Sequence, residues 1–516
     1  MKATNGERRV AVVGAGPAGL VNARFLAEHG FEPEIFESSE SLGGQWNSDA
    51  PHSGVWPSMV TNTSALMTCF SDLPHLPETA VYATNRQMLA YLHRYAEHFR
   101  LERCIRLGTR LEHIERGSGG WALRIARPNG AVAIENFPRV VIATGRYRRP
   151  IMAPVRGLGE FTGCGGAIHA FRYKQPERFR GLRVLVGGSN ISGLEIASDL
   201  ASLGAARVVA AARRQRYILL KLLAGVPHDQ IGLSRFGAHA QTMMPAEIAA
   251  EIRKAFVLRT CGSPEQYGAP RPHPNVFVAG VGLSQHFLPL VAEGRITVRP
   301  WISDINGNRV AFEDGSSEEV DAIVFGTGYA LDLPFLDREI GAILDLNAQH
   351  ADLYEYTFHP DLDGLAFAGL YELNGPYFPS LELQARWIAH VWAGVIPAPT
   401  PERMRAGIAS YRSGRGLAQA RPSNVISLLF SRAAGVEPDA RHWPTLARAL
   451  WFGPLSSVSF RLDGPGRLSD AAERYQVDAT SCGAVPSPEF APEQRRLLQT
   501  LATYDPVARG FVESLA

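Results

Sequence analysis

The stretch RRVAVVGAGPAGLVNARFLAEHG, residues 8–30, decides the fold of this chain. A short run rich in β-branched residues, 10–13, meets a glycine-rich turn, and apolar residues at helical spacing follow until Gly30. A second strand, EPEIFE, then ends at Glu37. Strand, turn, helix and strand in this order predict the β-α-β unit of a dinucleotide-binding fold.

The glycines of this turn, Gly14, Gly16 and Gly19, have the spacing G-x-G-x-x-G. The first permits the tight turn, the second lets the backbone approach a pyrophosphate, and the third lets helix and strand pack closely. The helix N-terminus adds N–H groups for the phosphates, and Glu37 stands about 20 residues on, where an acid binds a ribose. A turn without a ligand is the alternative, but strand, helix and acid together favour a nucleotide site. The predicted contacts are Gly14, Gly16, Pro17, Ala18, Gly19 and Glu37.

A second, less regular unit is GLRVLVGGSNISGLEIASDLASLGAARVVAAARR, residues 181–214. Asn190 stands where the middle glycine of the motif would be, and asparagine tolerates unusual backbone angles better than most residues. Arg213 and Arg214 stand where an acid marks an NAD site, and guanidinium groups there pair with a 2′-phosphate. This favours NADP, with Arg213 as the first choice for the phosphate contact, although a solvated basic turn is the alternative. The predicted contacts are Gly188, Ser192, Gly193, Arg213 and Arg214.

Two dinucleotide sites in one chain indicate a division of labour, in which one binds FAD and the other binds the reductant, NADPH. We therefore predict an α/β fold with two Rossmann-like dinucleotide-binding domains, the FAD domain being discontinuous in sequence. Residues 1–165 and 320–396 are expected to form the FAD-binding domain, and 166–319 the NADP-binding domain with a helical insertion at about 218–274. Residues 397–516 form a C-terminal extension.

Composition excludes several other classes. The formal net charge of +2 over 516 residues argues against nucleic acid as a partner. The five cysteines form no C-x-x-C pair, so no metal site is expected. The N-terminal MKATNGERRV lacks the apolar core of a signal peptide, and no run reaches the roughly 18 apolar residues of a membrane span. We expect a cytoplasmic protein that does not bind a membrane; a homodimer remains open.

An ordered series of further segments spans most of the chain. They are GAGPAGL (14–20), FESSESLGGQW (36–46), TNTSALMTCFSDLP (61–74), ATG (143–145), FGTGY (325–329), ELQARW (382–387) and FGPLSSVSFRLDGPG (452–466). In order and number these segments resemble those of the flavin-containing monooxygenase family.

The resemblance implies a specific chemistry. NADPH would reduce FAD, the reduced flavin would react with O₂ to give a C4a-hydroperoxyflavin, and a soft nucleophile such as an amine or sulfide would attack its distal oxygen. Asn62 aligns with the family's active-site asparagine, whose amide would bind NADP⁺ and the peroxyflavin; a turn-forming asparagine is the alternative. Gln384 is expected in the first turn of a helix that starts against the flavin. The cofactor contacts that the resemblance adds are Gln45, Trp46, Thr61, Asn62, Thr63, Thr144, Gly145 and Gln384.

One departure concerns the family's fingerprint, F-x-G, three residues, His, three residues, then an aromatic and a basic residue. Here five residues separate Gly163 from His169, while Tyr173 and Lys174 fit. The related Baeyer–Villiger monooxygenases, which oxygenate ketones, usually carry Trp where Tyr173 stands. Tyr173 therefore favours oxygenation of an amine or sulfide. A Baeyer–Villiger enzyme and an uncoupled NADPH oxidase remain as alternatives, and the identity of the small-molecule substrate stays open.

Overall fold

Two parallel five-stranded sheets form the frame of the computed structural model, which describes residues 5–415, 421–483 and 487–515. The first sheet has the order β22 (Leu365–Phe367), β7 (Arg139–Ile142), β1 (Arg9–Val13), β2 (Glu32–Phe36) and β3 (Ile105–Arg106). The second has the order β16 (Ile296–Arg299), β11 (Arg207–Ala211), β10 (Arg183–Gly187), β20 (Ala322–Phe325) and β9 (Gly166–His169). Every pairing in both sheets is parallel. The predicted α/β fold with two Rossmann-like units is confirmed.

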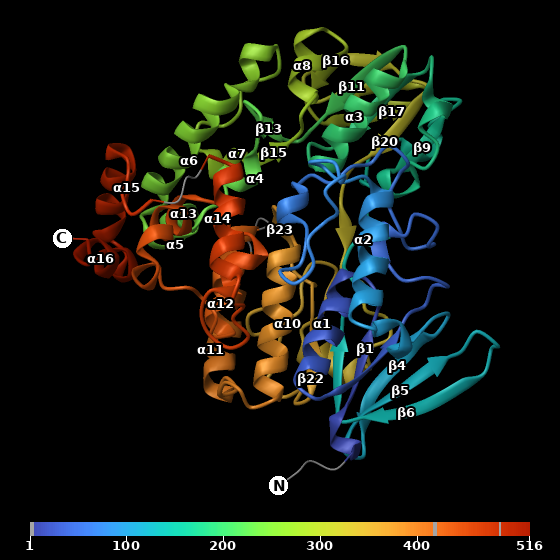
Figure 1. The fold of residues 1–516 in the computed structure, drawn as a ribbon. Coiled ribbons are helices and arrows are strands. Elements are labelled where there is room, and N and C mark those ends of the chain that lie inside the picture. The colour runs from blue at the N-terminus through green and yellow to red at the C-terminus, as the bar shows by residue number, and fades with distance from the viewer. Residues whose placement is uncertain (1–4, 416–420, 484–486, 516) are drawn as a thin grey trace.

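Each sheet is built around one of the two glycine-rich segments (Figure 1). Strand β1 is followed by α1 (Pro17–Glu28), with proline at the first helical position where no N–H is needed. Strand β10 is followed by α3 (Ile191–Leu203), which ends at Gly204 with φ +90°. Residues 10–13 are buried on both faces, as a central parallel strand requires. Helix α10 (Phe378–Trp392) packs beside α1.

Strand β20 departs from the sequence prediction, which placed residues from 320 onward in the first domain. Ala322 pairs with Val184 of β10 and with Gly166 of β9, so β20 completes the second sheet. All four residues of β20 are buried, because a strand between two parallel neighbours is covered on both faces. The chain therefore leaves the second sheet after Phe325 rather than before it.

Two antiparallel sheets of three strands each flank this frame. One consists of β4 (Arg110–Gly117), β5 (Gly120–Ala126) and β6 (Val132–Phe137), with a turn at the sequence PNG, residues 128–130, between β5 and β6. The other consists of β17 (Ile302–Asn306), β18 (Arg309–Phe312) and β19 (Ser317–Glu319). Helix α2 (Asn85–His98) starts with a capping box, in which Gln87 N donates to Thr84 Oγ1 at 3.2 Å and Thr84 N donates to Gln87 Oε1 at 2.9 Å. Among the helices of the described residues, none combines the length and the apolar character that crossing a membrane requires.

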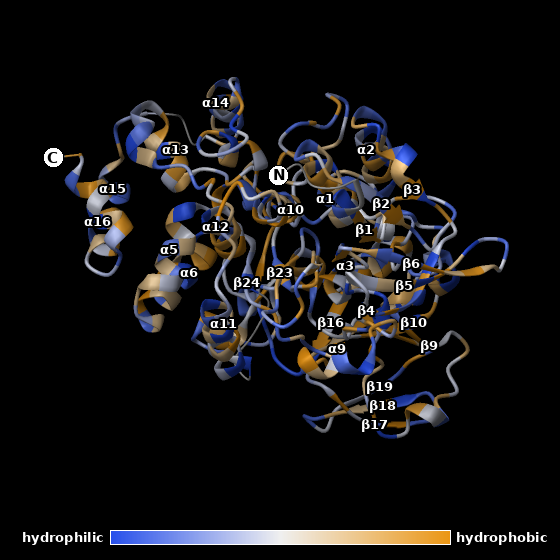
Figure 2. Ribbon diagram, turned by 90° about the horizontal axis from the view of Figure 1, so that it is seen from below, coloured by the Kyte–Doolittle hydropathy of each residue, from blue (hydrophilic) through white to orange (hydrophobic). Residues whose placement is uncertain are grey.

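The region after β11 carries α4 (His228–Ile231), α5 (Arg235–Met243), α6 (Ala246–Cys261) and α7 (Val276–Ala279). The C-terminal region carries α11 (Pro401–Ser413), α12 (Ser423–Ala433), α13 (Ala447–Phe452), α14 (Ala471–Ser481), α15 (Pro492–Ala502) and α16 (Pro506–Glu513). Helices α13, α15 and α16 lie beside α5 and α6, on the side away from β17–β19 (Figures 1 and 2). Phe236 and Ala249 share one hydrophobic core with Trp451 and Phe511, so the two regions fold as one body.

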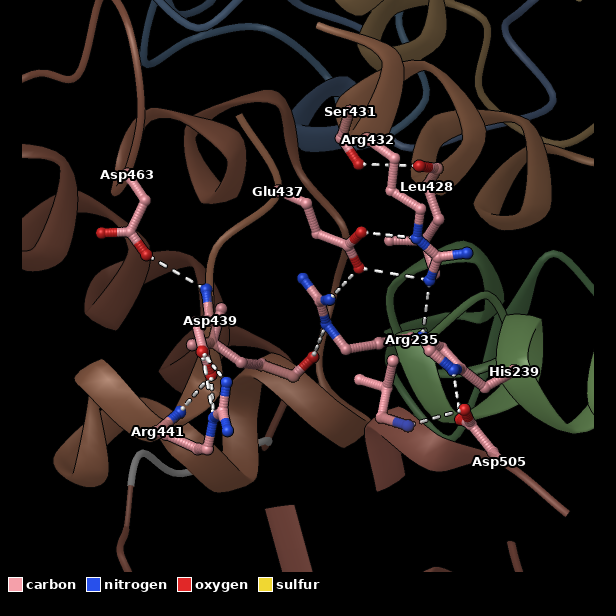
Figure 3. Close-up of polar contacts among 12 residues, drawn as sticks. Arg235, His239, Leu428, Ser431, Arg432, Glu437, Asp439, Arg441, Asp463 and Asp505 are labelled. Atoms are coloured by element: carbon pink, nitrogen blue, oxygen red, sulfur yellow. Dashed lines mark hydrogen bonds and ion pairs between the residues drawn. The ribbon is translucent and has the colours of Figure 1, made fainter. Parts of the chain in front are cut away.

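A buried polar network reinforces this contact (Figure 3). His239 Nδ1 and Asp505 Oδ2 are 2.5 Å apart, and an Arg432 guanidinium nitrogen is 3.0 Å from His239 Nε2. Because arginine only donates, Nε2 accepts, and the proton of the neutral ring sits on Nδ1 and is donated to Asp505. Glu437 accepts from Arg432 at 2.6 Å and from Arg235 at 2.5 Å. The network therefore joins α5, α12 and the residue that caps α16.

Candidate functional site

One cavity of about 1470 Å³ is lined by both nucleotide-binding units. Single-ligand pockets usually measure about 300–1,000 Å³, so this cavity is large enough for more than one small molecule. It lies at the carboxyl ends of the parallel strands, where open α/β sheets bind ligands. The predicted site residues that line it are Gly14, Gly16, Pro17, Ala18, Glu37, Gln45, Trp46, Thr61, Asn62, Thr63, Thr144, Gly145, Ser192 and Arg214.

The first glycine turn is packed so closely that side chains do not fit. Gly14 has φ +106°, and a Cβ atom there would lie 2.6 Å from the carbonyl oxygen of Ala143. A Cβ atom on Gly19 would lie 1.8 Å from the oxygen of Gly14. Gly16 lies against Gly44, with 3.4 Å between its ideal Cβ position and the Gly44 Cα atom. The turn thus brings bare backbone to the cavity wall, as phosphate binding requires.

Glu37 is buried and holds two backbone segments at this wall. Its carboxylate accepts a hydrogen bond from Ala15 N at 2.8 Å and another from Ser39 N at 2.8 Å. Both carboxylate oxygens are used, one for each segment. Glu37 lines the cavity as well, so its position agrees with that of a ribose-binding acid.

The second glycine turn repeats this geometry. Gly188 has φ +119°, and a Cβ atom on Gly193 would lie 2.2 Å from the Gly188 oxygen. These two glycines serve backbone packing rather than lining the cavity. Asn190 has φ −78° and ψ 169°, nearly the angles of Gly16 in the first unit (φ −80°, ψ −176°). The middle position therefore needs no positive φ, and asparagine is accommodated without strain.

The two adjacent arginines after β11 point to different places. Arg214 lines the cavity and donates to the carbonyl oxygen of Val278 at 3.1 Å. Arg213, the first choice from sequence, instead lies over the ring of Trp301, with its guanidinium carbon 5.1 Å from the ring centre. Arg216, which the sequence reasoning did not single out, also lines the cavity. Successive residues after a strand point to opposite sides, so position in the sequence could not rank these neighbours.

Asn62 lies in a loop that is held firmly at both ends. Thr61 N donates to Ala83 O at 2.8 Å, and Ser64 N donates to Asp229 Oδ2 of α4 at 2.7 Å. Burial raises the pKa of Asp229 to about 6, while the hydrogen bonds from Ser64 oppose that shift. Asn62 itself is partly exposed to the cavity, and within the described chain no hydrogen bond joins its amide to another residue. An Asx turn is therefore not what holds this loop.

The fingerprint residues connect the Asn62 loop to the second unit despite the longer spacing. Tyr173 is fully buried, and its hydroxyl donates to Asp199 of α3 at 2.9 Å. Ser58 donates to the same carboxylate at 3.1 Å, and Lys174 Nζ donates to Val55 O at 2.5 Å. Residues 55–58, just before the loop, are thus tied to the second sheet's helix. His169 lines the cavity, with its ring 5.1 Å from that of Tyr329.

Gln384 does not line the cavity, contrary to the sequence expectation. Helix α10 begins at Phe378, earlier than expected, which places Gln384 in its second turn. Its amide is fully used: Nε2 donates to Thr357 Oγ1 at 2.7 Å and to Phe367 O at 3.0 Å, and Oε1 accepts from Gly369 N at 2.9 Å. Phe378 and Leu381 of the same helix do line the cavity. The start of the helix therefore reaches the site. Gln384 lies outside the cavity wall and accepts a hydrogen bond from Gly369, which lines the cavity.

The cavity wall carries polar atoms that have no partner within the described chain. The hydroxyls of Thr61 and Thr144 and the Nε2 atom of His228 are buried and unpaired. A buried polar atom without a partner is costly unless a ligand satisfies it. Together with the bare glycine turns, these atoms fit a flavin and a nicotinamide dinucleotide, which offer phosphates, ribose hydroxyls and ring edges.

Several lining residues were not anticipated from the sequence, among them His52, Trp56, Arg216, His228, Arg253 and Tyr377. One signal was available: on α6, Arg253 falls on the same helical face as the buried Ala250 and Val257. A charge on an apolar face is unusual, which makes Arg253 a candidate site residue. Separately, His113, Glu115 and Asp337 lie close enough to share a cation, but they do not line the cavity, and Asp337 caps α9 (Arg338–Ile343).

Comparisons with known proteins agree with this geometry. A family model described as flavin-binding monooxygenase-like matches residues 7–479. The chain is 31% identical over 492 residues to dimethylaniline monooxygenase [N-oxide-forming] 2 of Oryctolagus cuniculus, covering 90% of each chain. Flavin-containing monooxygenase 2 of Homo sapiens is 30% identical with the same coverage. Among solved structures, S-allyl-L-cysteine S-oxygenase from Allium sativum has a TM-score of 0.59 at 22% identity, covering 98% of each chain. Cyclohexanone monooxygenase in its open form has a TM-score of 0.61 at 17% identity, covering 83% of this chain and 97% of the other.

Proposed function

Because this chain belongs to the flavin-binding monooxygenase-like family, we propose that it transfers one oxygen atom of O₂ to a soft nucleophile, an amine or a sulfide. The protein is an NADPH-dependent flavin monooxygenase with FAD and NADPH as cofactors. Bound FAD supplies the chemistry that activates O₂, with electrons from NADPH. The residues of this chain bind, orient and enclose the reacting groups.

The observation that carries the proposal is the single cavity shared by both glycine turns and Asn62. We assign FAD to the turn at Gly14–Gly19 and NADPH to the turn at Gly188–Gly193. Residues of both turns and the loop that carries Asn62 line the same cavity, so this loop would lie beside both cofactors. The amide of Asn62 can donate to the activated oxygen and accept from the nicotinamide side, because none of its hydrogen-bonding capacity is used within the described chain.

An amine or sulfide is favoured over a ketone for two reasons. A relative at 31% identity is named as N-oxide-forming. Tyr173 stands where Baeyer–Villiger monooxygenases usually carry tryptophan. It is fully buried and its hydroxyl donates to Asp199, a hydrogen bond that a tryptophan at this position would have to replace. The likeness to cyclohexanone monooxygenase, at 17% identity, supports the fold alone.

A substrate panel tests the proposal directly. Purified enzyme with FAD is supplied with NADPH, O₂ and matched amines, sulfides and ketones, and NADPH consumption and oxygenated product are measured together. We expect one mole of amine or sulfide product for each mole of NADPH. Ester or lactone formed from ketones alone would instead establish the Baeyer–Villiger reaction. NADPH consumption with hydrogen peroxide and no oxygenated product would establish an oxidase.

The positions of the two arginines predict their effects on cofactor choice. A charge-assisted hydrogen bond to phosphate contributes about 1.5–3 kcal/mol, so we expect Arg214→Ala to raise the KM for NADPH about ten- to a hundredfold. The KM for NADH should hardly change, because NADH has no 2′-phosphate. Arg213→Ala, with its guanidinium over Trp301, is the matched control and should have the smaller effect. Steady-state kinetics with both cofactors would show the assignment to be wrong if Arg213→Ala gave the larger loss.

A further inference from the structure

Arg253 is a cation that faces the cavity without an acid beside it. It projects from the apolar face of α6 and lines the cavity. It donates a long hydrogen bond, 3.3 Å, to the carbonyl oxygen of Gly232, and its guanidinium carbon lies 5.7 Å from the centre of the Phe256 ring. Burial lowers the pKa of Arg253 to about 10, and within the described chain no ion pair joins it to a carboxylate. A guanidinium held in such a place is costly unless an anion from outside the chain pairs with it.

His228 lies beside Arg253 and adds a second unsatisfied group. It is buried, lines the cavity, and its Nε2 atom has no partner within the described chain. Burial, together with the charge of Arg253, lowers the pKa of His228 to about 3, so the ring is neutral near pH 7. A neutral imidazole can donate one hydrogen bond to an anion without adding to the local charge.

This pair is separate from the arginines assigned to the cofactor phosphate. Arg214 donates to Val278 O and lowers the pKa of Arg216, in addition to the effect of burial. Arg253 instead lies on α6 and donates to Gly232 O, at the end of α4. The cavity therefore contains two distinct cationic regions, one after β11 and one between α4 and α6.

The second region is connected to the proposed reaction centre. Helix α4 carries His228 at its start, and the next residue, Asp229, accepts hydrogen bonds from Ser64 N at 2.7 Å and Ser64 Oγ at 3.1 Å. Gln230 donates to Ser64 Oγ at 3.0 Å. Ser64 stands two residues after Asn62, so α4, which begins at His228, is hydrogen-bonded to the loop that carries Asn62.

We propose that the substrate is an anionic soft nucleophile, a carboxylate-bearing sulfide or amine, whose carboxylate pairs with Arg253 and accepts a hydrogen bond from His228. This inference rests on the proposed function for the identity of the reacting atom. A single guanidinium presents two parallel N–H groups that match a carboxylate. The heteroatom would then react within the same cavity, which Asn62 also lines.

The test uses 3-(methylthio)propanoate and its amide, which differ in charge and hardly in shape. Binding of each to the FAD-loaded enzyme with NADP⁺ is measured by calorimetry, and oxygenation is measured separately. We expect the acid to bind at least about tenfold tighter than the amide, as a charge-assisted pair implies. Arg253→Gln should remove this preference and leave the affinity for the amide unchanged, and Arg253→Lys should restore part of it.

Lys254→Gln is the matched control, because it removes a positive charge from the neighbouring residue of α6, whose ammonium group lies 4.0 Å from Glu251. It should keep the full preference for the acid. Full FAD content and an unchanged circular dichroism spectrum show that each variant is folded.

The outcomes separate this inference from the proposed function. If Arg253→Gln weakened NADP⁺ binding and left the acid-to-amide ratio unchanged, Arg253 would belong to the cofactor phosphate and the inference would be wrong. Equal binding of acid and amide by the unchanged enzyme would also overturn it, even if both sulfides were oxygenated. Arg253-dependent binding of the acid without oxygenation would support the inference while contradicting the proposed reaction.

Discussion

Gly14→Val is expected to abolish FAD binding. The φ angle of +106° is one that a β-branched residue rarely adopts, and the new Cβ atom would lie 2.6 Å from the Ala143 carbonyl oxygen. To relieve this contact the turn must open, which moves the start of α1 away from the phosphates. The purified variant should be colourless, and the ratio of flavin to protein absorbance measures the loss.

Gly30→Val separates a local effect from general backbone strain. Gly30 has φ +82° at the end of α1, but no atom lies within 4 Å of its Cβ position and it does not line the cavity. This variant carries a comparable backbone cost without the steric contact, so it should remain yellow. Full flavin content in Gly14→Val, or equal loss in both variants, would contradict the assignment of FAD to the first turn.

Asn62→Ala is expected to uncouple the reaction. Removing a preorganised hydrogen-bond donor from a reaction centre typically costs about 3 kcal/mol, or about a hundredfold in rate. Transfer of hydride from NADPH does not need this amide, so NADPH should still be consumed and FAD should stay bound. Oxygen should then leave as hydrogen peroxide in place of oxygenated product, and assaying peroxide, product and NADPH together measures the ratio.

Asn62→Asp distinguishes a donor from a merely well-shaped side chain. Aspartate has nearly the same shape but offers no N–H, and its charge repels a developing anion. It should therefore be as uncoupled as the alanine variant. Normal coupling in either variant would mean that backbone groups and the bound cofactor stabilise the activated oxygen without Asn62.

The two β-α-β units could be predicted because their signals are local. A buried strand, a glycine turn and a helix lie within about 30 residues of one another, and the boundaries of α1 and α3 follow from Gly16, Pro17 and Gly204. The capping box at Thr84 could be predicted for the same reason. The spacing of the glycines within one β-α-β unit determines which backbone atoms come into contact, and it does not depend on the rest of the chain.

What the sequence could not provide was orientation across long separations. The partners of Gln384 lie as many as 28 residues away, so nothing near it in the chain revealed that its amide was already satisfied. Strand β20 joins a sheet whose neighbour, β10, lies in a unit more than a hundred residues earlier, and apolar strands read alike in either sheet. Arg253 can be identified as a candidate anion-binding residue only in the folded structure, where α4 places His228 beside it.

The contact between His239 and Asp505 also has a consequence for how the protein is made. Asp505 follows His239 by 266 residues, so α5 leaves the ribosome long before the acceptor of its imidazole proton exists. Gln241 of α5 and Arg253 of α6 line the cavity, and both helices pack on the C-terminal core. The nucleotide-binding sheets can assemble as they emerge from the ribosome. The part of the cavity wall formed by α5 and α6 can assemble only after the C-terminal helices have been synthesised. Newly synthesised enzyme should therefore acquire its flavin before it acquires a finished substrate pocket.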